Sequence, residues 1–173
     1  VVEIDVIIFE LGLKGRDMAE KTLKVHFTEA MLAALEETFE NVQGIYLDRG
    51  TSLFETLATI SAEEASRPVS TNCASIAAHV EHVRFYIETT MQFLRGERPQ
   101  VDWTEIWRTV RAVTPEEWAA SQQRLRETYD RIRAWVMSMT TWEGEDEVGG
   151  ALALLMHNAY HLGEIRQAFC TLK

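Results

Sequence analysis

Two histidines near the carboxyl end of the chain, His157 and His161, carry its clearest chemical signal. They lie four residues apart in residues 155–164, a segment that reads as helix. Residues with this spacing lie on one helical face, one turn apart, so both imidazoles can reach a single metal ion. A His-x-x-x-His pair also occurs by chance in helices that bind no metal, so the pair alone predicts a site only if further ligands are available.

Further imidazoles are available upstream, where His79 and His82 lie in a second predicted helix. Two histidines from one helix and one from another would supply three nitrogen ligands and leave one coordination position open, which suits catalysis better than structure. No Glu follows His157, so the metalloprotease pattern His-Glu-x-x-His and its general base are absent. The remaining histidine, His26, is expected to precede the first long helix as a solvated or capping residue.

The elements that must position these histidines are helices. Four long segments carry apolar residues at helical spacing, and no convincing run of alternating residues follows residue 18. Four such helices predict an all-α four-helix bundle with short helices in its connections. The long segments are residues 28–42, 73–94, 115–139 and 147–171, and the shorter ones lie near residues 53–60, 61–64 and 102–107.

Capping signals support these bounds. The third long helix begins with Thr114 as cap, Pro115 at the first helical position and Glu117 three residues after the cap. Gly96 followed by Pro99 ends the second helix. Histidines inside a bundle are costly unless their ring nitrogens are satisfied, so a cluster buried between two of these helices would indicate a ligand.

Length, composition and charge exclude several classes of protein. The 173 residues fit one domain, and the formal net charge of −10 with no Lys/Arg cluster argues against a nucleic-acid partner. The apolar run at residues 6–9 is too short to span a membrane. Cys73 and Cys170 lack Cys-x-x-Cys spacing and are expected to be free thiols of a cytoplasmic protein, although a disulfide stays an alternative.

Residues 157–167 and 75–83 together resemble the DinB/YfiT-like superfamily of metal-binding proteins. The resemblance covers nearly all of the chain from about residue 27, including the helix order and the long second connection. It implies a DinB-like four-helix bundle domain at residues 27–173, and residues 1–26 are expected to form an N-terminal extension of open role. It also implies a divalent metal ion, commonly nickel or zinc, held by one histidine of the second helix and a His-x-x-x-His pair of the fourth.

Carried over to this sequence, the resemblance assigns three metal ligands. His157 and His161 match the pair in the fourth helix. In the second helix the family pattern resembles Ile-Ala-x-x-x-x-His-Val, and residues 76–83 match it with His82 as the ligand. His79 lies one turn earlier and is the alternative ligand.

The resemblance also implies a class of activity. Relatives are thiol-dependent transferases and isomerases in which the metal activates a low-molecular-weight thiol such as mycothiol or bacillithiol. We therefore expect a metal-dependent S-transferase acting on a small electrophile, in a homodimer. The alternatives are a metal-dependent hydrolase and a non-catalytic dimeric metal-binding bundle. A fourth protein ligand would favour the non-catalytic bundle, because structural zinc sites are usually closed by four.

Other side chains near these histidines allow two interpretations each. Glu164, close after His161, either orients an imidazole of the site or pairs with arginine on the helix surface. Tyr160 and Asn158 are expected to pack or cap, and Tyr86, one turn after His82, could line a pocket.

The tryptophans divide into two predicted groups. Trp118 and Trp135 fall at core spacing in the third long helix. Trp103, Trp107 and Trp142 lie in connections that could cover an open end of the bundle, so they are candidates for lining a substrate pocket.

Overall fold

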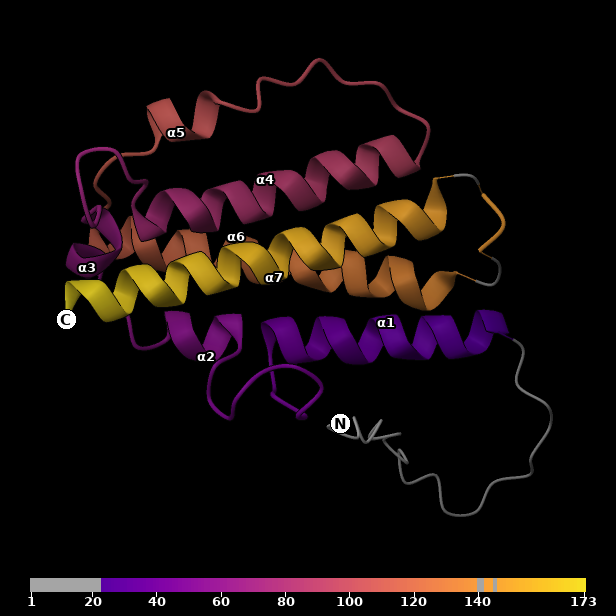
Figure 1. Cartoon of the computed structure of the whole chain (residues 1–173). Coiled ribbons are helices and arrows are strands. Elements are labelled where there is room, and N and C mark those ends of the chain that lie inside the picture. Colours follow the sequence, from indigo (N-terminus) through magenta and orange to yellow (C-terminus); the bar gives the residue numbers. More distant parts are fainter. Residues whose placement is uncertain (1–22, 140–141, 145) are drawn as a thin grey trace, which may run out of the picture.

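A computed structural model describes residues 23–139, 142–144 and 146–173. Within this part of the chain there are seven helices and no strand, as Figure 1 shows. In chain order the helices are α1 (Leu23–Phe39), α2 (Leu53–Leu57), α3 (Ala62–Ser66), α4 (Ile76–Leu94), α5 (Glu105–Thr109), α6 (Pro115–Ser138) and α7 (Glu147–Leu172).

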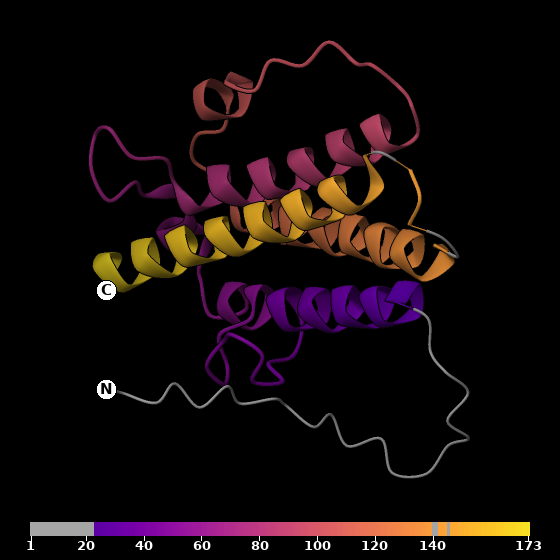
Figure 2. The same ribbon diagram turned by 45° about the vertical axis from the view of Figure 1, so that its right-hand side comes forward.

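The four long helices α1, α4, α6 and α7 pack as a bundle (Figures 1 and 2). Helices α1 and α4 each pack against both α6 and α7, so α1 and α4 occupy diagonal corners. The short helices α2 and α3 lie in the connection from α1 to α4, and α5 lies in the connection from α4 to α6. The predicted all-α bundle with short helices in its connections is confirmed.

Local capping explains where the helices that carry the histidines begin and end. The Ser75 hydroxyl accepts a hydrogen bond from the Ala78 backbone N–H at the start of α4, which therefore begins three residues later than the predicted start at residue 73. Gly96, with φ of +80°, follows the end of this helix in the left-handed region that favours glycine. At the start of α6, Thr114 and Glu117 form the predicted capping box.

The core is a continuous set of apolar side chains from all four long helices. Their burial is the main force that holds α4 and α7 together beside the histidines. Trp118 is buried as predicted, and its indole N–H donates to the Ile60 carbonyl, whereas Trp135 is half-buried at the edge of the core. The fully buried members include Leu35, Phe39, Val80, Val83, Ile87, Leu125, Ile132, Leu154 and Ile165.

The first long helix differs from its prediction at both ends. It runs over Leu23–Phe39 instead of residues 28–42, so His26 lies inside α1 and does not precede it; its side chain is exposed, as expected. No Pro or Gly interrupts residues 23–27, so nothing local stops the helix from starting earlier.

The end of α1 is set by the buried carboxylate of Glu37. It accepts backbone N–H bonds from Gln43, Ile45, Tyr46 and Leu47, which folds the chain back against the helix. Burial raises the pKa of this carboxyl, but the backbone donors outweigh burial and hold the pKa below its usual value. A helix continued to residue 42 could not bring these N–H groups to Glu37.

One further expectation, that of two free thiols, is met within the described residues. Cys73 and Cys170 are exposed free thiols with no bridge between them. None of the helices in the described ranges has the length and apolar character needed to cross a membrane. Residues 1–22 lie outside the described part, so the predicted extension at residues 1–26 is left untested.

Candidate metal centre

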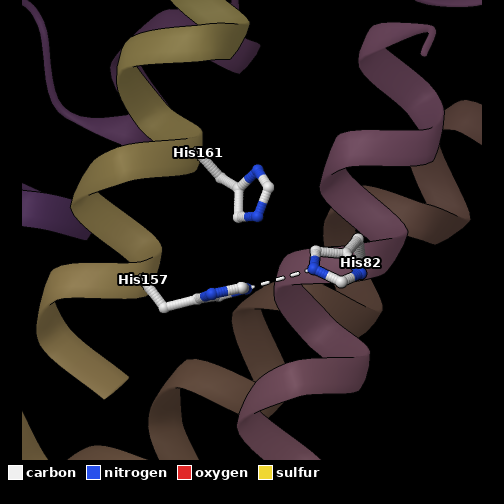
Figure 3. A group of neighbouring side chains, drawn as sticks. All are labelled: His82, His157 and His161. Carbon is white, nitrogen blue, oxygen red and sulfur yellow. Dashed lines mark hydrogen bonds between the residues drawn. The ribbon is translucent and has the colours of Figure 1, made fainter. Parts of the chain in front are cut away.

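The four clustered histidines meet where α4 packs against α7. His79 and His82 lie almost one turn apart on α4, and His157 and His161 lie one turn apart on α7. His82 and His161 are only 6% and 5% exposed. Figure 3 shows the rings of His82, His157 and His161 turned toward one another from the two helices.

The three predicted ligands have the spacing of atoms that share one ion. Nε2 of His157 lies 3.1 Å from Nε2 of His82 (Figure 3), and one nitrogen from each of the three rings falls within 4.8 Å of the others. Imidazole nitrogens bind zinc at about 2.0–2.1 Å, which places two ligands of a tetrahedral ion roughly 3.3 Å apart. The cluster could therefore hold a metal ion, and its role as the ligand set stays a prediction.

The electrostatics of the cluster favour neutral rings, the form that binds metals. Burial, together with the neighbouring rings of His161 and His82, lowers the pKa of His157 to about 4. Burial, with His82 and His79 nearby, lowers the pKa of His161 to about 3. The pKa of His82 is lowered by burial as well. At neutral pH each of these rings is therefore uncharged and has one nitrogen whose lone pair can bind a cation.

Aromatic side chains hold two of the rings in place. Tyr86 stacks on His157 with ring centroids 3.5 Å apart and planes inclined by 14°. Trp107, from α5, lies over His82 with a centroid separation of 4.3 Å. Tyr86 was a candidate for pocket lining, and the structure instead places it against a ring of the cluster.

One nitrogen of the cluster lacks a protein partner. Nδ1 of His82 is buried and makes no hydrogen bond within the described part of the chain. A buried donor or acceptor without a partner costs free energy, and no acceptor holds this ring in one tautomer. The strong contact of His82 is instead through Nε2, which faces His157. Nε2 is therefore the nitrogen of His82 that faces the other rings of the cluster.

Glu164 lies beside His161 and His79, which favours the first of its two predicted interpretations. Its Oε2 is 2.7 Å from Nδ1 of His161 and 3.4 Å from Nδ1 of His79. Its other oxygen, Oε1, accepts a hydrogen bond of 2.7 Å from the Tyr160 hydroxyl. Tyr160 was expected to pack or cap, and its pairing with this carboxylate was missed, although a spacing of four residues within one helix is a signal for such a pair.

An open cavity of about 980 Å³ adjoins the histidines. It is bordered by the connection at residues 69–74 and by side chains of α4, α5 and α7. Its wall includes His161 but neither His82 nor His157, so the cavity meets the three-imidazole cluster at His161. The other wall residues used below are His79, Trp107, Arg111, Tyr160 and Glu164.

Only one of the three tryptophans predicted to line a pocket borders this cavity. Trp107 does so, and Trp103 instead packs against Phe85 and Tyr86. Trp142 packs on Phe27 and donates its indole N–H to Thr28, so its prediction as a pocket residue is wrong. All three tryptophans lie in connections, as the sequence predicted. The residues that each side chain contacts depend on how those connections fold back over the helices.

Among the described residues, the cluster of His82, His157 and His161 offers three possible ligands. Within the described residues no Cys, Asp or Glu joins His82, His157 and His161 in one group of mutually close ligand atoms. Three ligands would leave a coordination position for a substrate or a water molecule, as catalytic zinc sites do.

Comparisons of this chain with models of known protein families, with curated proteins and with solved structures found no match.

Proposed function

We propose that this chain is a metal-dependent enzyme of the DinB/YfiT-like type, in which His82, His157 and His161 hold one divalent ion, nickel or zinc. The observation that carries the proposal is the position of His161, which belongs both to the three-imidazole cluster and to the wall of the cavity. A small molecule in that cavity would therefore lie beside one ligand of the ion. A purely structural ion would not need this access.

The donor set supports this choice of metal. Three neutral imidazoles suit zinc and nickel, and three protein ligands leave the coordination sphere open. When bound, such an ion supplies Lewis-acid chemistry that lowers the pKa of a thiol or of water and so generates a nucleophile at neutral pH.

The protein side chains position the rings and shape the cavity wall. Tyr86 and Trp107 pack on the rings of His157 and His82 and restrict their rotation. Glu164 lies against Nδ1 of His161, which leaves Nε2 of that ring for the ion. Arg111 adds a cation to the cavity wall, which favours a substrate with an anionic group.

The reaction proposed for this centre is transfer of a low-molecular-weight thiol to a small electrophile. The thiol sulfur forms a bond to the electrophilic carbon, the bond from that carbon to its leaving group breaks with its electron pair, and the thiol proton departs with the leaving group. The 980 Å³ cavity has room for both reactants beside His161.

Cobalt spectroscopy tests the thiol reaction directly. Metal-free protein is loaded with one equivalent of Co²⁺, and low-molecular-weight thiols are added at millimolar concentrations. We expect a sulfur-to-cobalt charge-transfer band, which should be absent in His157→Ala. An unchanged spectrum with every thiol would contradict the transferase proposal and leave hydrolysis, or a non-catalytic ion, as the better account.

A further inference from the structure

A second set of three ligand atoms lies on the cavity side of His161. Nδ1 of His79 and Nδ1 of His161 are 3.1 Å apart, and Oε2 of Glu164 is 2.7 Å from the latter and 3.4 Å from the former. These separations resemble those between ligands of one ion with metal–ligand bonds of about 2.0–2.2 Å. His79, His161 and Glu164 form a group in which all ligand atoms are mutually close.

Hydrogen bonding does not account for this arrangement. Two imidazole nitrogens that face each other can share only one proton. Oε2 of Glu164 is buried and makes no hydrogen bond of regular geometry, although it lies close to both rings. A buried carboxylate oxygen without a hydrogen bond costs free energy, and a cation among the three atoms would remove that cost.

Glu164 is held in the orientation that such a cation needs. The Tyr160 hydroxyl donates to Oε1, which leaves Oε2 turned toward the two rings. All three ligand residues and Tyr160 border the cavity, so solvent or substrate can complete the coordination sphere.

The His161 ring stands between the two groups. In Figure 3 one of its nitrogens lies on the side of His82 and His157, and the other points away from them. The nitrogen that points away is Nδ1, because Nδ1 contacts Glu164 and His79. The ring thus presents Nε2 to the first group and Nδ1 to the second.

We propose that His79, His161 and Glu164 form a second site for a divalent cation such as Zn²⁺, joined to the first through the His161 ring. The proposal deepens the proposed function, since it makes the centre binuclear, and it depends on that function only through the shared His161. The second cation takes the place of the proton on Nδ1 of His161, and that proton is released to solvent. Glu164 supplies a negative charge that offsets the repulsion between two cations, and the second cation should bind more weakly than the first.

Zinc stoichiometry tests the proposal. Metal-free protein is equilibrated by dialysis against buffered free Zn²⁺, and bound zinc is measured by mass spectrometry of the elements. We expect two equivalents per chain, and one in His79→Gln and in Glu164→Gln. His82→Gln and His157→Gln should lose the other equivalent, and Glu127→Gln, an exposed carboxylate on α6 outside both groups, should keep both.

The outcomes separate the two sites. A single equivalent that depends on His82 and His157 but not on His79 or Glu164 would overturn the second site and leave the proposed function intact. An equivalent that depends on His79 and Glu164 alone would support the second site and contradict the first. Two equivalents that survive both His79→Gln and Glu164→Gln would overturn the second site as well.

A milder variant tests the second site even if the ligand variants misfold. Tyr160 is exposed, and Tyr160→Phe removes only the hydroxyl that holds Oε1 of Glu164. We expect the second zinc ion to bind with several-fold lower affinity and the first to bind with unchanged affinity. The helical circular dichroism should equal that of the unaltered chain. Unchanged affinity at both sites would count against the orientation of Glu164 proposed here.

Discussion

Nε2 of His157 and Nε2 of His82 face each other at 3.1 Å across the packed interface of α7 and α4. Both rings have a pKa lowered by burial, and each is covered by an aromatic side chain. Two neutral imidazoles held this close share one proton at best. Their juxtaposition is a property of the bundle as a whole, because it needs two helices in one particular register.

Removal of a ligand should release the metal and leave the bundle folded. We expect His157→Ala to lose at least tenfold in metal affinity, whereas helical circular dichroism changes little, because apolar burial provides most of the stability. Metal analysis and circular dichroism of the purified variant measure both. His26→Ala, at an exposed histidine on α1, is the control and should retain the metal. Unfolding of His157→Ala would show instead that the ion is structural.

The metal-free protein should lose stability in mild acid. In the folded state the pKa values of His157 and His161 lie at about 4 and about 3, below the ordinary value of 6.5. The unfolded chain therefore binds more protons as the pH falls from about 6.5 toward 4, and each pKa unit corresponds to roughly 1.4 kcal/mol between the two protonation states. Calorimetry should show a falling melting temperature over this range.

The double variant His157→Gln/His161→Gln provides the matching control. It removes both lowered pKa values, so its melting temperature should depend less on pH between 6.5 and 4 than that of the unaltered metal-free chain. An equally steep decline in both proteins would assign the acid sensitivity to other groups, such as the Glu37 carboxyl with its lowered pKa.

Binding of an open-shell ion should quench one tryptophan in particular. Trp107 lies 4.3 Å from His82 by ring centroids, so Ni²⁺ at the three-imidazole cluster would sit close to its indole. We expect Ni²⁺ to reduce the tryptophan fluorescence, and Trp107→Phe to remove most of that reduction. Trp142→Phe, which alters a ring packed on Phe27, should leave the reduction in place. Equal quenching in both variants would contradict an ion beside His82.

Core packing sets the stability of the scaffold. Leu125 on α6 is completely buried, and Leu125→Ala should lower the free energy of unfolding by about 2–5 kcal/mol through lost burial and a residual cavity. Leu152 on α7 is 41% exposed, and Leu152→Ala should cost less than about 1 kcal/mol. Urea unfolding of the two variants provides the comparison. Similar losses would mean that the packing of α6 differs from the one described.

Much of the bundle could be predicted from residue order because the signals are local. Apolar spacing and caps placed α4, α6 and α7 within about three residues, and Thr114 and Gly96 act at the ends where they were expected. The start of α1 was missed because residues 23–27 carry no stop signal, and its end was missed because Glu37 binds a loop up to ten residues away. A contact between a helix residue and a following loop produces no periodic pattern in the sequence.

The sequence by itself determined that His157 and His161 share one helical face and that His79 and His82 lie together on another, because helical geometry follows from spacing alone. Only the tertiary structure decided which rings meet. In the folded chain His82 lies against His157, His79 lies close to Glu164, and Trp107 borders the cavity. These pairings depend on the rotation and register of α4 against α7 and on the path of a long connection, which are set by packing between distant segments and not by the order of neighbouring residues.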